Sequence, residues 1–182
     1  EDFNISDLYA SLVADRDRSQ LIIDDLVSSL EEGRSPLLLT ERTAHLEYFE
    51  KELQTLPYKT IVLRGGMGKK QRKAAANQIA ESNGQQRVIL ATGRYIGEGF
   101  DDSKLDTLFL AMPVSWTGTL QQYVGRLHRL HDQKKVVQVY DYVDHTVPQL
   151  QRMFQRRIKG YKSIGYRFVE PAQNTLFAAN GV

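Results

Sequence analysis

The sequence predicts an α/β domain built on a mainly parallel sheet. Five short apolar runs alternate along the chain with longer stretches whose apolar residues recur at helical spacing. Alternating strands and helices form parallel sheets, because each helix crosses over the sheet and returns the chain in the same direction. The first run is continuously apolar, which is typical of a strand buried on both faces. The chain therefore has the pattern of a sheet covered by helices.

A helical region opens the chain. Asp15 is a good N-cap, and the apolar residues that follow it end at Gly33, so residues 16–32 are expected to form an amphipathic helix. Residues 1–14 have a weaker pattern, which fits either a short helix or a connector from a preceding domain. The run from Pro36 to Thr40 is the first expected strand.

Four more strands follow along the chain. They are expected at 60–63, 87–91, 107–112 and 136–141. Helices are expected around 46–53, over 71–81 and 119–129, and from about 147 to 162. The last dozen residues lack clear periodicity and fit a packed tail or an extension toward another domain. We divide the chain into an N-terminal connector and helix at 1–34, a main domain at 35–165 and a tail at 166–182.

Composition narrows the classes of function. A chain of 182 residues with 41% hydrophobic content is long enough to bury one sizeable core. It has no cysteine, and its four histidines are scattered, so zinc and redox chemistry are not expected. No apolar run reaches membrane-spanning length. We expect a cytoplasmic protein without a membrane partner, and the start at Glu1 suggests a piece of something longer.

Charge is distributed unevenly along the chain, although the formal net charge is only +2. Residues 1–58 carry 13 acidic and 5 basic side chains, whereas residues 119–167 carry 3 acidic and 10 basic ones. The second half is therefore where a polyanion such as nucleic acid is expected to bind. A dipolar surface without a partner is the alternative.

The helix expected over 119–129 has two different faces. Gln122, Gly125, Arg126 and Arg129 fall within one arc. The opposite side carries apolar residues, namely Leu120, Tyr123, Val124, Leu127 and Leu130. Two guanidiniums beside a glycine suit phosphate oxygens, because each presents a fork of donors. The alternative is a solvated surface helix, with Thr119 and Gln122 as an ordinary capping box.

Other informative residues follow strand ends, where ligands of parallel sheets bind. Thr40 ends the first strand, Gly65 and Gly66 follow the second, and a loop over 92–101 with three glycines follows the third. The stretch from Gly65 to Lys70 lacks the spacing of a phosphate-binding Walker loop. Its lysines are more simply a solvated helix start than a nucleic-acid contact.

Together these segments resemble the second RecA-like domain of superfamily-two helicases, a three-layer α/β/α sandwich. Gln122-x-x-Gly-Arg-x-x-Arg129 resembles motif six of that family. Ala91-Thr92 through Gly99-Phe100-Asp101 resembles motif five, and Leu37–Arg42 resembles the looser motif four. Trp116 and the Asp141-Tyr-Val-Asp144 segment look most similar to the DEAD/DEAH-type branch that contains XPB-like helicases and restriction-enzyme motor subunits.

The resemblance implies roles for individual residues. Arg126 and Arg129 would be catalytic arginine fingers on the γ-phosphate of ATP, with Gln122 orienting them. Gly97, Glu98 and Gly99 would shape a nucleotide-binding loop, and Asp101 would touch the ribose or the fingers. The residues expected to bind nucleic acid are Thr40, Arg42, Gly65, Thr92 and Gly93.

The resemblance also implies a missing half. The nucleotide loop and the metal-binding Asp-Glu motif belong to the family's first RecA-like domain, and the sequence contains neither. ATP and Mg²⁺ would be held mainly by that domain, as part of the same polypeptide. We expect an ATP-dependent helicase or translocase, with DNA favoured over RNA, whose isolated second half is inactive. The alternatives are an RNA helicase and a non-catalytic RecA-like module that binds nucleic acid or protein.

Overall fold

The computed structural model describes residues 4–82, 84–93, 104–129, 136–169 and 177–181. Its strands form one seven-stranded sheet in the order β2-β3-β1-β4-β5-β7-β6. The parallel strands are β1 (Pro36–Thr40), β2 (Lys59–Leu63), β3 (Arg87–Thr92), β4 (Thr107–Leu110) and β5 (Val137–Asp141). The five predicted strands and the mainly parallel sheet are thereby confirmed.

Two further strands extend the sheet in the opposite direction. β6 (Tyr166–Val169) pairs antiparallel with β7 (Phe177–Gly181), and β7 pairs antiparallel with β5. Both lie in the tail at 166–182, for which no strand was predicted. β6 is only four residues long and three of them are exposed, so it lacks the apolar alternation that marks a strand in sequence.

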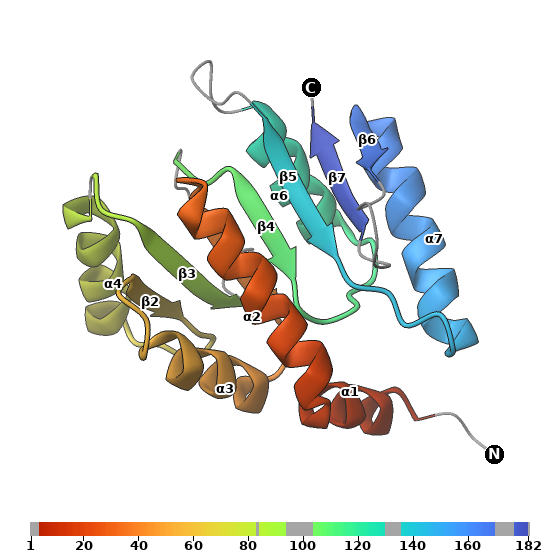
Figure 1. Cartoon of the computed structure of the whole chain (residues 1–182), viewed down its shortest axis with the longest axis horizontal. Coiled ribbons are helices and arrows are strands. Elements are labelled where there is room, and N and C mark those ends of the chain that lie inside the picture. The colour runs from red at the N-terminus through yellow and green to blue at the C-terminus, as the bar shows by residue number, and fades with distance from the viewer. Residues whose placement is uncertain (1–3, 83, 94–103, 130–135, 170–176, 182) are drawn as a thin grey trace.

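Helices cover both faces of the sheet (Figure 1). α2 (Arg16–Glu31) and α3 (Thr43–Leu53) pack on one face, while α4 (Lys69–Glu81), α6 (Gly118–Arg129) and α7 (Pro148–Ser163) lie on the other. α1 (Ile5–Ala14) is a helix, which settles the open choice for residues 1–14. Asn4 and Asp15 cap the starts of α1 and α2 through their side-chain oxygens.

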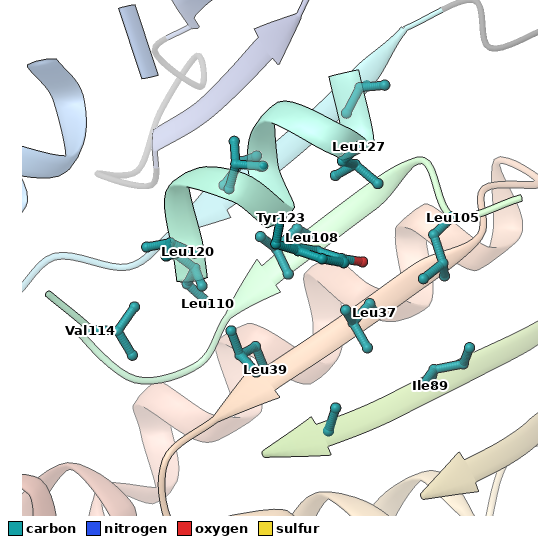
Figure 2. Packing of buried hydrophobic residues seen from close by; sticks show 14 of the residues in the cluster. Leu37, Leu39, Ile89, Leu105, Leu108, Leu110, Val114, Leu120, Tyr123 and Leu127 are labelled. Atoms are coloured by element: carbon teal, nitrogen blue, oxygen red, sulfur yellow. The ribbon is translucent and has the colours of Figure 1, made fainter. Parts of the chain in front are cut away.

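Alternation along β1 explains the two cores. Leu37 and Leu39 face α6, whereas Leu38 faces α2 and α3, and all three are almost fully buried. Figure 2 shows Leu120, Tyr123 and Leu127 of α6 on the side of the sheet that carries Leu37 and Leu39 of β1 and Leu108 and Leu110 of β4. The apolar side of α6 is therefore core, as predicted, and its opposite side faces outward.

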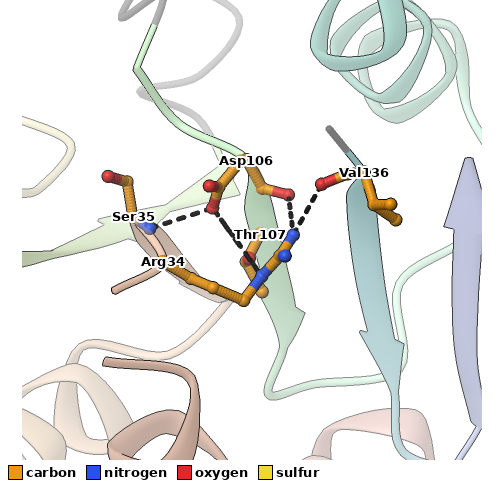
Figure 3. Close-up of polar contacts among 5 residues, drawn as sticks. All are labelled: Arg34, Ser35, Asp106, Thr107 and Val136. Carbon is orange, nitrogen blue, oxygen red and sulfur yellow. Dashed lines mark hydrogen bonds and ion pairs between the residues drawn. The ribbon is translucent and has the colours of Figure 1, made fainter. Parts of the chain in front are cut away.

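Polar contacts bind the amino ends of the strands together (Figure 3). Arg34 donates to Thr107 Oγ1 at 2.6 Å and to the carbonyl oxygens of Asp106 and Val136 at 3.1 and 2.7 Å. The Asp106 carboxylate in turn accepts from the Ser35 N–H at 2.9 Å. This network ties β1, β4 and β5 at the edge opposite the predicted functional residues, so its charges serve the fold.

Candidate nucleotide and nucleic-acid site

The carboxyl ends of the five parallel strands meet at one edge of the sheet. Thr40 is paired in register with Thr92, Leu39 with Leu110, and Leu110 with Asp141. Loops and helix starts that follow these strands therefore converge, which is where ligands of parallel sheets bind. The described residues among those predicted as a site belong to this edge or to α6.

At the end of β1, Thr40 is fully buried. Its hydroxyl lies 3.1 Å from Nδ1 of His45 and accepts from the backbone N–H of Arg42 at 3.4 Å. The Arg42 guanidinium donates to Ser6 Oγ at 3.1 Å and lies 5.6 Å from the ring centre of Tyr9. In this arrangement Thr40 shapes the loop from inside, and Arg42 is the residue of the pair that reaches the surface.

His45 is the unusual residue beneath this loop, and the sequence did not single it out. Burial, reinforced by the positive charges of Arg18 and Arg16, lowers the pKa of His45 to about 3. The ring is thus neutral at physiological pH. It packs 4.5 Å from the ring of Phe49, which places a titratable group in the core under the site.

The ends of β2 and β3 are joined by a direct hydrogen bond. Gly65 donates its backbone N–H to Thr92 Oγ1 at 3.0 Å. Gly65 and Gly66 line an open pocket of about 380 Å³, and Gly66 has a φ of 82°, which favours glycine. A Cβ on Gly93 would collide with the carboxylate of Glu41, so the Glu41 side chain lies directly against Gly93. The structure thus brings Gly65, Thr92 and Gly93 together.

On α6, the outward face matches the sequence interpretation as far as it is described. Gln122 is exposed, and a Cβ on Gly125 would meet open space. Arg126 and Arg129 belong to the helix, while their side chains lie outside the described part. The loop residues Gly97, Glu98, Gly99 and Asp101 also lie outside the described residues, so their roles stay predictions.

The connection from β4 to α6 is held by side chains from three different helices. Arg18 of α2 donates to the carbonyl of Ala111 at 2.6 Å, and Tyr9 of α1 donates to that of Pro113 at 2.5 Å. Arg157 of α7 donates to the carbonyl of Val114 at 2.7 Å. Each bond satisfies a backbone group outside regular structure, so the path that leads into α6 is fixed.

Arg157 is fully buried, although it belongs to a helix with several other basic residues that are exposed. It donates two hydrogen bonds to the Asp141 carboxylate, Nε to Oδ2 at 2.7 Å and Nη2 to Oδ1 at 2.9 Å. Tyr161 donates to the same Oδ2 at 2.9 Å. Every polar group of this cluster is satisfied, as a buried ion pair requires.

Electrostatics within this cluster favour the ion pair. Burial opposes the charge on Arg157, but the Asp141 carboxylate outweighs it and raises the pKa of the guanidinium above its usual value. Burial and the same carboxylate raise the pKa of the Tyr161 hydroxyl well above its usual value. Both groups therefore keep their donor protons throughout the physiological range.

Trp116 provides a further anchor for the start of α6. Its ring lies 5.1 Å from that of Tyr161 in an edge-on arrangement. A Cβ on Gly160 would collide with the indole ring, so only glycine allows this approach. The predicted importance of Trp116 came from resemblance alone, and the structure gives it a physical role in seating α6 against α7.

Within the described part of the chain, no three His, Cys, Asp or Glu side chains are grouped so that they could hold a metal ion. Nor does any helix among the described residues have the length and apolar character needed to cross a bilayer.

A mainly parallel sheet covered on both faces, with α6 and Gly65 at its carboxyl edge, is the architecture expected of the second RecA-like domain of superfamily-two helicases. A family model described as "Helicase conserved C-terminal domain" matches residues 19–131. The chain belongs to this family, which confirms the resemblance inferred from its motifs.

Curated relatives include viral proteins. The chain is 30% identical over 120 residues to transcript termination protein OPG145 of monkeypox virus, which covers 65% of this chain and 24% of that protein. It is 28% identical over 160 residues to protein 161L of Invertebrate iridescent virus 6, covering 84% of this chain and 35% of the relative. The chain thus spans about a quarter to a third of these proteins.

Solved structures share the fold. T4 UvsW superposes with a TM-score of 0.68 at 17% identity, covering 90% of this chain and 36% of UvsW. The C-terminal part of the Fun30 ATPase domain gives a TM-score of 0.60, also at 17% identity, covering 73% of this chain and 42% of the other. The expected RecA-like architecture is confirmed.

Proposed function

We propose that this domain is the C-terminal motor half of an ATP-dependent DNA helicase or translocase. The observation that carries the proposal is the seating of α6: its apolar face is buried, and three helices fix the connection leading into it. Because Gln122 is exposed, we expect from helical periodicity that Arg126 and Arg129 share its side of α6. A rigid helix presenting two arginines suits stabilisation of charge on a transferring phosphoryl group.

The nucleotide would lie between α6 and a first RecA-like domain. That domain would supply the phosphate loop and the carboxylates for Mg²⁺, which these 182 residues lack. Gly97, Glu98, Gly99 and Asp101 would line the nucleotide from this side. Arg126 and Arg129 would reach the γ-phosphate, with Gln122 holding them in place.

Nucleic acid would follow the ends of β1, β2 and β3. Gly65 lets a backbone approach closely, while Thr92 and Arg42 offer polar contacts to phosphates. Gly93 would join them once the Glu41 carboxylate turns away from it. Thr40, being buried, would keep the Arg42 loop in position. Because the poxvirus relatives are named transcript termination proteins, single-stranded DNA and RNA should be compared directly as activators.

The finger role is tested by Arg129→Ala in a longer polypeptide that carries this chain and a first RecA-like domain. Nucleic-acid-stimulated ATP hydrolysis is expected to fall by about 10³-fold or more, because transition-state charge loses its partner. Gln121→Ala, an exposed neighbour on α6, is the matched control and should retain the rate. Turnover of the Arg129 variant near the wild-type rate would reject the role. The 182-residue chain by itself should give no turnover.

A further inference from the structure

A second surface with the chemistry of a polyanion site lies far from Gly65. A groove of about 750 Å³ opens between α7 and β6, beyond the opposite end of the sheet from β2 and α4 (Figure 1). Its polar rim consists of His145, Gln151, Arg152, Gln155 and Arg156, and Phe168 of β6 also lines it. This groove contains none of the residues assigned to the nucleotide or to the strand track.

Among the described residues, no carboxylate forms an ion pair with the exposed basic side chains of α7. α7 contains no acidic residue over its 16 positions. Arg152 contacts Gln149 at 3.2 Å, whereas Arg156 and Lys159 make no ion pair with any described residue. With Arg157 withdrawn into the core, Arg152 and Arg156 stand one helical turn apart on the exposed side. Two neighbouring guanidiniums without carboxylates favour an anionic ligand.

An aromatic side chain accompanies these arginines. Phe168 is 37% exposed on β6, and both neighbours in the strand, Arg167 and Val169, are also exposed. A partly exposed aromatic ring beside basic side chains is the pattern by which proteins hold single strands, with phosphates on the cations and a base stacked on the ring. In a duplex the bases stack on one another, so none is available to stack on the Phe168 ring.

We propose that the groove between α7 and β6 binds single-stranded nucleic acid, with phosphates against Arg152 and Arg156 and a base against Phe168. This inference rests on the proposed function for its ligand class, but the groove is a separate contact from the track at β1, β2 and β3. It would hold a strand entering or leaving the motor.

Binding of a fluorescein-labelled oligo-dT of about 20 nucleotides to the 182-residue chain tests the groove by anisotropy. The Arg152→Gln/Arg156→Gln variant should bind on the order of 10-fold more weakly. The dependence of log K on log salt should become shallower by about 1.4, since two phosphate contacts on a single strand are lost. Lys69→Gln/Lys73→Gln on α4 is the matched control, because it removes two exposed charges at the same spacing.

The aromatic contact has its own pair of variants. Phe168→Leu keeps an apolar side chain but removes the stacking ring, and should weaken binding by about 5-fold or more. Phe168→Trp keeps a stacking ring and should bind like the wild-type chain. Thermal unfolding of each variant verifies that the fold is intact.

Several results would contradict the proposal that the groove binds single-stranded nucleic acid. They are an equal loss in the lysine control, unchanged binding after loss of both arginines, equal binding of a duplex, or a preference for an acidic peptide or phosphatidylserine vesicles over oligo-dT. A chain that fails to bind oligo-dT also overturns the groove, yet leaves the proposed function standing if Arg129→Ala still abolishes stimulated hydrolysis in the longer polypeptide. If oligo-dT binds as expected but Arg129→Ala leaves stimulated hydrolysis unchanged, the groove proposal stands and the arginine-finger role is rejected.

Discussion

His45 makes the stability of this domain dependent on pH. Its pKa is lowered to about 3 in the folded chain, against about 6.5 when unfolded. Between these pH values the His45 ring is protonated in the unfolded state and neutral in the folded state. The free energy of unfolding therefore falls as the pH drops below 6.5. The loss is about 1.4 kcal/mol per pH unit, or about 2.5 kcal/mol between pH 6.5 and 4.5. The contribution fades about one pH unit above the unfolded pKa, where the ring is neutral in both states.

Urea unfolding at pH 7 and pH 4.5 measures this effect. In His45→Gln, which keeps a polar group beside Thr40, the pH dependence should shrink by about that amount, whatever packing is lost at pH 7. His145→Gln, at an exposed position, is the control and should leave the dependence unchanged. An identical pH dependence in wild type and His45→Gln would contradict the assignment.

Arg157 shows what residue types alone conceal. It is one of several basic residues on the last helix, yet it lies on the same stripe as Leu150, Phe154 and Tyr161. That spacing was visible in the sequence. What was not visible is that Asp141, at the end of a neighbouring strand, would supply a buried carboxylate. A charge on an apolar stripe needs a partner, and partners distant in sequence appear only in the fold.

At the scale of elements, α6 and α7 are coupled through Trp116 and Gly160. Gly160→Ala normally stabilises a helix, by about 0.5–1 kcal/mol. Here the added methyl collides with the indole ring, and overpacking of that kind costs about 1–3 kcal/mol. We therefore expect Gly160→Ala to destabilise the wild-type chain and to stabilise the Trp116→Ala variant.

A double-mutant cycle measured by chemical unfolding checks this reversal of sign. The coupling energy should be about 2 kcal/mol, within the range found for side chains in contact. Additive effects of the two substitutions would show that Trp116 does not seat α6 on α7.

Strands and helices differed in how far the sequence revealed them. The five parallel strands and the faces of α6 were predictable, because burial on both sides or on one side leaves an apolar pattern. β6 and β7 were not, since a short edge strand with Arg167, Phe168 and Val169 exposed has no such pattern. The glycine and threonine positions at strand ends were also predictable. The hydrogen bond between Gly65 and Thr92 was not, because it joins residues 27 positions apart that only the sheet brings together.

At the scale of the whole molecule, the antiparallel pair completes one side of the sheet. Without it β5 would be an edge strand with unpaired backbone groups, beside the arginines of α7. Tyr166 also reaches across to α6, where its hydroxyl donates to the carbonyl of Val124 at 3.1 Å and its ring joins the core. The C-terminal segment thus contributes to holding α6, together with α1, α2 and α7.

Shortened chains test this contribution. A chain ending at Gly165, where the sequence suggested that the main domain stops, loses the buried ring of Tyr166, and comparable losses of aromatic residues cost about 3–5 kcal/mol. A chain ending at Val169 keeps Tyr166 and loses the pairing of β7 with β5 and β6. Unfolding midpoints should fall in the order full chain, 1–169, 1–165. Tyr166→Phe in the full chain isolates the hydroxyl and should cost about 0.5–1.5 kcal/mol. Equal midpoints for the full chain and 1–165 would mean that α6 is held without the C-terminal strands.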